Sequence, residues 1–94
     1  MGTIVIHPAE IILDEMRERG WDIDRLASEM VSPGNAKEWG VTRLSWEMYL
    51  EVREPYVLLG DHMAGQLKKA FGVDTQFFLN LHENWRKYVT RVEG

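Results

Sequence analysis

Apolar residues recur at helical spacing in five separate stretches, and this repeated pattern is the feature that most constrains the fold. Each stretch is bounded by residues that interrupt a helix, chiefly glycine, proline and aspartate. A chain of 94 residues with 45% hydrophobic content has the size and composition of one small domain with a packed core. Thr3–Ile6 are all β-branched, so residues 1–6 are expected to form a short extended arm. The sequence therefore predicts a single all-α domain over residues 1–94.

The ends of the predicted helices are marked by residues with specific roles at helix termini. Pro8 suits the first turn of a helix because its missing N–H would have no partner there. Gly20 and Gly72 are expected to end the first and fourth helices, since glycine readily adopts the left-handed conformation of a helix C-terminus. Aspartates are expected to cap the second, fourth and fifth helices: Asp22 or Asp24, Asp61, and Asp74.

Residues 22–52 have the pattern of a helix-turn-helix motif. A short amphipathic helix is followed by a loop predicted over residues 31–39, which contains the breaker cluster SPGNA. Gly40 is expected to provide the tight turn, and Thr42 is expected to cap the next helix. This third helix is predicted to end near Val52, because a proline follows shortly after.

Five short strings of residues stand in a recognisable order: His7-Pro8, Glu10-Ile11-Ile12, Leu26-Ala27, Phe71-Gly72-Val73 and Phe77-Phe78-Leu79-Asn80-Leu81. Their order and spacing resemble the HigA-type antidote proteins of the lambda-repressor-like, XRE-type helix-turn-helix group, over residues 6–30 and 60–86. Ala9 stands where that family usually has glycine, and Gly40-Val41-Thr42 comes later after Leu26-Ala27 than in the family. The chain thus resembles a longer-loop variant of the group, of a kind associated with phage or mobile-element genes.

The resemblance implies a five-helix fold and a DNA-binding transcriptional regulator, with helix three in the major groove of a two-fold site. It also implies a homodimer, and a protein partner such as a toxin. The residues expected near base edges lie on helix three: Thr42, Arg43, Leu44, Ser45 and Glu47. The nearest candidates for phosphate contacts are Arg25, Lys37 and Arg53. The apolar face of the last helix is expected to help hold the dimer through Trp85, Tyr88, Val89 and Val92, although for Trp85 packing within its own domain is favoured.

The charge of the chain supports an alternative function. The net charge is −4, and the polar side of helix three carries Arg43 but also Glu47, Glu51 and Glu54. Carboxylates near phosphates would repel them. The alternative is a protein-interaction module that has the same fold but no longer recognises DNA. Convergence of the candidate cations on one face would favour DNA, and dominance of that face by the glutamates would favour a protein partner.

Other classes of function are disfavoured by the residues present. The absence of cysteine excludes disulfides, thiolate metal sites and cysteine nucleophiles. The three histidines lack the spacing of a metal-ligand pair, and His7 is expected to cap or pack at a helix start, with His62 and His82 on the surface or in packing. Neither converging catalytic carboxylates nor a phosphate-binding glycine loop is present, so an enzyme and a cofactor are not expected. No apolar run approaches a membrane span and no signal peptide is evident, so a cytoplasmic protein is expected.

Overall fold

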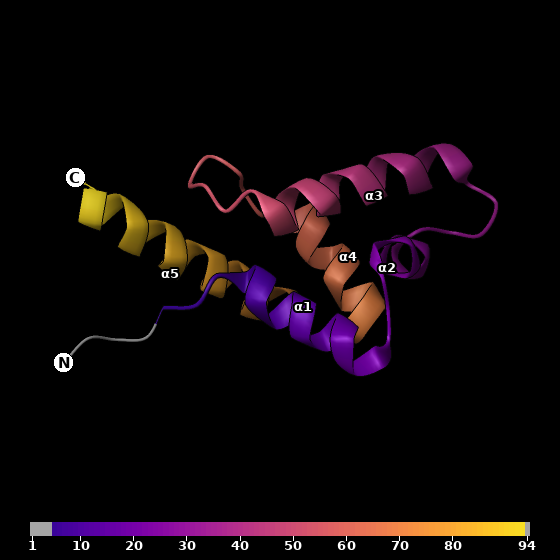
Figure 1. The fold of residues 1–94 in the computed structure, drawn as a ribbon, viewed down its shortest axis with the longest axis horizontal. Coiled ribbons are helices and arrows are strands. Elements are labelled where there is room, and N and C mark those ends of the chain that lie inside the picture. Colours follow the sequence, from indigo (N-terminus) through magenta and orange to yellow (C-terminus); the bar gives the residue numbers. More distant parts are fainter. Residues whose placement is uncertain (1–4, 94) are drawn as a thin grey trace.

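The computed structural model describes residues 5–93, which form five α-helices and no β-strand (Figure 1). The helices are α1 (Pro8–Arg19), α2 (Ile23–Met30), α3 (Ala36–Glu51), α4 (Asp61–Phe71) and α5 (Thr75–Glu93). The all-α prediction and the number of helices are confirmed. The predicted arm over residues 1–6 lies largely outside the described residues, and Val5 and Ile6 have no regular secondary structure.

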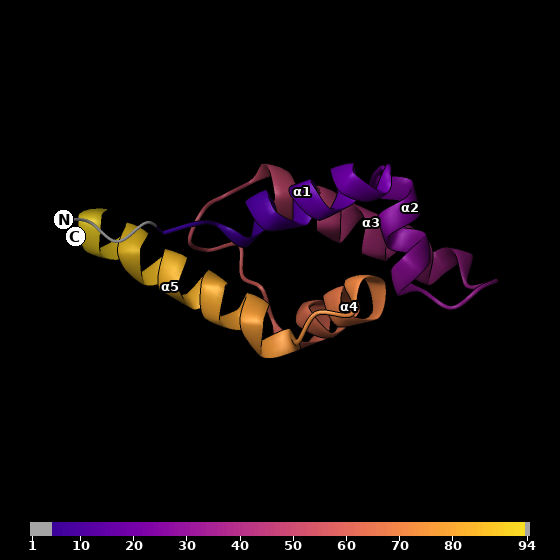
Figure 2. The ribbon, with the colours of Figure 1, turned by 90° about the horizontal axis from the view of Figure 1, so that it is seen from below.

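The helices pack in two groups around one core. Seen from below, α4 and α5 lie along one side of the molecule, and α1, α2 and α3 lie along the other (Figure 2). The most extensive contact between two helices joins α2 to α3, and α4 packs on both α2 and α5. Each helix contributes at least one large, fully buried apolar side chain to the centre, among them Ile12, Leu26, Trp46, Leu67 and Phe78. Such burial supplies most of the stabilisation of helices this short.

Most of the predicted helix ends are confirmed. The N-cap of α1 is His7, whose Nδ1 accepts a hydrogen bond from the Ala9 N–H at 3.0 Å. Gly20 ends α1 with φ 69°, and Gly72 ends α4 with φ 75°, both in the left-handed region that favours glycine. Asp22 is the aspartate that caps α2, since its carboxylate accepts from the Arg25 N–H at 2.8 Å.

The caps of the last two helices follow the prediction only in part. Asp74 accepts a hydrogen bond from the Gln76 N–H at 3.0 Å, as a cap of α5 should. Asp61 does not cap α4: the N-cap is Gly60, and no side chain accepts a hydrogen bond there. Asp61 is instead the first residue of the helix, where its negative charge favours the positive end of the helix dipole.

The start of α3 differs from the prediction. The helix begins at Ala36 rather than Thr42, and the connection from α2 covers only residues 31–35, so the predicted loop over 31–39 is wrong. Asn35 is the N-cap: its Oδ1 accepts from the Glu38 N–H at 3.2 Å, and its Nδ2 donates to Glu38 Oε2 at 2.7 Å. This reciprocal pair resembles a capping box and starts the helix early.

Gly40 and Thr42 therefore lie inside α3 and do not form a turn. Gly40 is exposed and has a helical backbone conformation, without the positive φ of Gly20, Gly34 and Gly72. Thr42 is 5% exposed, and its hydroxyl accepts a hydrogen bond from Gln66 Nε2 at 3.4 Å. The prediction that Thr42 is an N-cap is wrong, because the Asn35 cap provides a stronger start signal upstream.

Candidate functional site

Helix α3 is apolar on two of its sides. One side enters the core, where Trp46 and Tyr49 are at most 1% exposed. The other side faces outward and carries Val41, Leu44 and Met48, which are 62%, 64% and 53% exposed. The spacing i, i+3, i+7 places these three side chains in one row along the helix. In Figure 1, α3 runs along one edge of the molecule.

The apolar row continues into the connection between α3 and α4, which loops out from the end of α3 (Figure 1). Tyr56 and Leu58 in this connection are 75% and 60% exposed. We call Val41, Leu44, Met48, Tyr56 and Leu58 together the outer stripe. A hollow of about 390 Å³ separates its two parts. The hollow is lined by Ser45, Met48, Tyr49, Val52, Tyr56, Val57, Leu58 and Met63.

Tyr56 and Leu58 were not among the predicted site residues. The signal that could have found them is the run of apolar residues directly after Pro55, in a segment too short and too interrupted for a helix. Large exposed apolar side chains that gather in one patch usually mark a surface that another molecule covers.

The arginine predicted to read bases is held by carboxylates of its own chain. Arg43 is ion-paired with Asp24 on α2 and, at 3.1 Å, with Glu47 one turn further along α3. The hydrogen bond with Asp24 raises the pKa of Arg43 above its usual value. Both ion pairs hold the guanidinium against its own chain, and the two carboxylates offset the positive charge that would attract a base or a phosphate.

Two of the three predicted phosphate contacts are also paired. Arg25 donates to Glu29 at 2.8 Å and lies over the Trp21 ring at 5.4 Å, and Arg53 pairs with Glu10 on α1. Lys37 is exposed and has no ion pair among the described residues. Three of the four candidate cations are therefore paired with carboxylates of their own chain and are not free to form a basic surface.

The five α3 residues predicted to lie near bases do not share a side of the helix. Thr42 points into the core, whereas Leu44 and Ser45 are exposed on the outer side. Two positions along an α-helix correspond to a rotation of about 200°, so Thr42 and Leu44 face nearly opposite ways. Only Leu44 and Ser45 of this set face outward without an ion-pair partner, and Leu44 belongs to the outer stripe.

The predicted dimer residues on α5 differ in what they contact. Trp85 packs edge-on against the His7 ring, with 4.5 Å between ring centroids, so it is used at least in part within its own domain. Val89 is half-buried, and Tyr88 is 44% exposed. The Val92 side chain lies outside the described residues. The homodimer through α5 stays a prediction.

Two buried histidines join three helices. His7 and His82 are 5% and 4% exposed, with 6.0 Å between their ring centroids, and both lie beside Tyr49 of α3. Burial, with smaller contributions from His82 and Arg53, lowers the pKa of His7 to about 4. Burial also lowers the pKa of His82. The expectations that His7 caps a helix and that His82 packs are confirmed. Within the described residues, no group of three or more His, Asp or Glu side chains is arranged to hold a metal ion.

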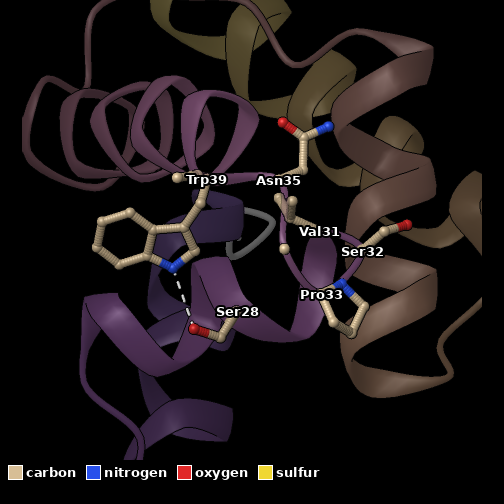
Figure 3. A pocket seen from close by; sticks show the side chains of 8 residues that line it. Ser28, Val31, Ser32, Pro33, Asn35 and Trp39 are labelled. Carbon is tan, nitrogen blue, oxygen red and sulfur yellow. Dashed lines mark hydrogen bonds between the residues drawn. The ribbon is translucent and has the colours of Figure 1, made fainter.

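A second hollow lies where α2 meets the start of α3 (Figure 3). It has a volume of about 440 Å³ and is lined by Ser28, Val31, Ser32, Pro33, Gly34, Asn35, Ala36 and Trp39. The Trp39 indole N–H donates to Ser28 Oγ at 3.0 Å, as the dashed line in Figure 3 marks. This bond ties the first turn of α3 to α2.

Comparison with protein-family models, with curated proteins and with solved structures finds no match to this chain. In the part of the chain that the structure describes, no helix is both long enough and apolar enough to cross a membrane.

Proposed function

We propose that this chain is a protein-interaction module whose docking surface is the outer stripe. The observation that carries the proposal is the second apolar side of α3, on which Val41, Leu44 and Met48 are each more than half exposed. Isolated exposed apolar residues are common on protein surfaces, but a continuous row beside a hollow is not. Water contact with such a row is unfavourable, and a partner that covers it gains the free energy of apolar burial.

The DNA-binding regulator implied by the resemblance to HigA-type antitoxins stays a prediction. Its lambda-repressor-like helix-turn-helix arrangement is supported by the close packing of α2 on α3 and by the order of the sequence motifs. Direct readout by α3 has less support, because Arg43 is paired and Thr42 is buried. A protein partner agrees with both readings, since antidotes of that family also bind a toxin.

The proposal is tested by site-specific photo-crosslinking in cells that produce the chain. A photoreactive residue replaces Leu44 in one variant and Glu18, exposed on α1, in the control. We expect discrete protein adducts from position 44, lost when Met48→Glu is added, and none of the same adducts from position 18. Absence of any adduct from position 44 would contradict the proposal.

DNA binding is measured in parallel by a salt titration with random duplex DNA. The comparison is between the unmodified chain and Arg43→Ala. Binding that falls steeply with salt and is lost in Arg43→Ala would place α3 on DNA and favour the regulator instead.

A further inference from the structure

The exposed side of α3 carries one row of side chains at regular spacing. Lys37, Val41, Leu44, Met48 and Glu51 are separated by four, three, four and three residues, which is the spacing of a heptad repeat. All five side chains are exposed. Heptad spacing keeps a row of side chains on one side of a helix, where a second helix can pack along it. The row is therefore suited to a helix–helix contact.

The two ends of this row carry opposite charges. Lys37 lies at the N-terminal end and Glu51 at the C-terminal end, with three apolar residues between them. Neither Lys37 nor Glu51 has an ion-pair partner among the described residues. A second α3 laid antiparallel, with the two Leu44 side chains at the centre, would place each Lys37 beside the other copy's Glu51. It would also bring Val41 and Met48 of the two copies to within one residue of each other along the helix axis, on both sides of the centre.

The positions that flank the centre allow close approach. Gly40 and Ser45, both exposed, lie on either side of the row near Leu44. A methyl group added at Gly40 would meet no other atom within 4 Å, so the surface there is open. Packed helices need axes roughly 8–10 Å apart, and small residues at the contact favour the lower end of that range.

We infer that the outer stripe receives a second copy of this chain, with the two α3 helices antiparallel around Leu44. This inference rests on the proposed function and names its partner. The contact is isologous, because each residue pair occurs twice around a two-fold axis. Tyr56 and Leu58, at the far end of the stripe, add apolar area beyond the helices. The net charge of −4 on each copy opposes association, so dimers are expected at micromolar rather than nanomolar concentrations.

The first experiment measures mass in solution as a function of concentration. Sedimentation equilibrium of the full chain should show a shift from 11.0 kDa towards a dimer, and Leu44→Glu should abolish it. The matched control is Phe77→Glu, which places the same charge on α5 at a side chain that is 45% exposed. This control should dimerise like the unmodified chain.

The second experiment tests the charge pairing by exchange. Lys37→Glu and Glu51→Lys should each weaken the dimer by about tenfold, since each creates two like-charge contacts. The double variant Lys37→Glu with Glu51→Lys should restore the original dissociation constant. Lys68→Glu, which makes the same charge change at an exposed site on α4, should have a much smaller effect.

The third experiment tests the direction of pairing, which the absence of native cysteine makes straightforward. Under mild oxidation, Leu44→Cys should form a disulfide-linked dimer, because this residue lies at the two-fold axis. Val41→Cys alone should crosslink poorly, and a mixture of Val41→Cys with Met48→Cys should crosslink well. Lys68→Cys gives the background rate.

Three results would overturn the inference. One is a chain that stays monomeric at all concentrations. Another is a charge exchange that fails to restore the dimer. The last is a dimer that survives Leu44→Glu but is lost in Tyr88→Glu, which would place the interface on α5. If the chain is monomeric but position 44 still crosslinks to other proteins, the proposed function stands and only the identity of the partner is wrong.

Discussion

The hydroxyl of Tyr49 lies 2.9 Å from Nδ1 of His82, and this hydrogen bond joins α3 to α5 inside the core. On the other side of the same imidazole, the Leu59 N–H donates to Nε2 at 3.4 Å. Because Nε2 accepts, the proton of the neutral ring is on Nδ1, which donates to the Tyr49 oxygen. One histidine thus fixes the position of α3, α5 and the connection that carries part of the outer stripe.

Replacing Tyr49 by phenylalanine should destabilise the protein. The change removes the acceptor for His82 Nδ1–H in a site where both side chains are almost fully buried. An unsatisfied buried donor costs about 1–3 kcal/mol. Urea unfolding followed by circular dichroism should show this loss, with Tyr56→Phe, at a side chain that is 75% exposed, unchanged as the control.

The stability should fall as the pH is lowered through the range in which free histidine titrates. The pKa of His7 is about 4 in the folded protein and 6.5 when unfolded, and that of His82 is also lowered. The unfolded chain therefore binds more protons in this window, so the stability is complete above about pH 6.5 and is lost towards pH 4. The loss from His7 alone is on the order of 3 kcal/mol.

Denaturant unfolding at a series of pH values measures this dependence. In His7→Asn, the asparagine can still cap α1 but does not titrate, so the slope between about pH 6.5 and 5 should be reduced. His62→Gln, at an exposed histidine, should keep the full slope. An unchanged slope in both His7→Asn and His82→Gln would show that other groups control the acid sensitivity.

Gly40→Ala should stabilise the protein by about 0.5–1 kcal/mol, because alanine has the higher helix propensity and loses less backbone entropy. Gly40 lies within α3, and a methyl group there meets open space. Thermal unfolding gives the comparison with Gly20→Ala, which should destabilise since Gly20 has φ +69°. If Gly40 instead formed a tight turn, both changes would destabilise.

Gln66→Leu should destabilise by about 1–3 kcal/mol, because it removes the partner of a buried indole N–H. Gln66 Oε1 accepts from Trp46 Nε1 at 3.0 Å, and its Nε2 donates to Thr42, which joins α4 to the buried side of α3. Guanidinium unfolding measures the loss. Gln76→Leu, at an exposed glutamine of α5, is the control and should change the stability little.

Local signals in the sequence were sufficient where a helix end depends on neighbouring residues. Gly20, Gly72, Asp22 and Asp74 act at helix ends as predicted, because the bonds and backbone angles involved span only a few positions. The observed start of α3 differs from the prediction for a related reason. Two competing signals, Asn35 and Gly40, lie close together, and the Trp39–Ser28 contact to α2 favours the earlier start.

The candidate site depended on contacts between distant residues. The sequence shows that α3 carries more apolar residues than one buried side needs, but it does not show which side faces the core. The side that faces the core is fixed by the hydrogen bonds of Trp46 with Gln66 and of Tyr49 with His82, which join residues 20 and 33 positions apart in the sequence. The ion pair of Arg43 with Asp24, on a different helix, likewise depends on the tertiary structure. The sequence by itself therefore determined the helices and most of their ends, and only the tertiary structure decided which apolar row is left for a partner.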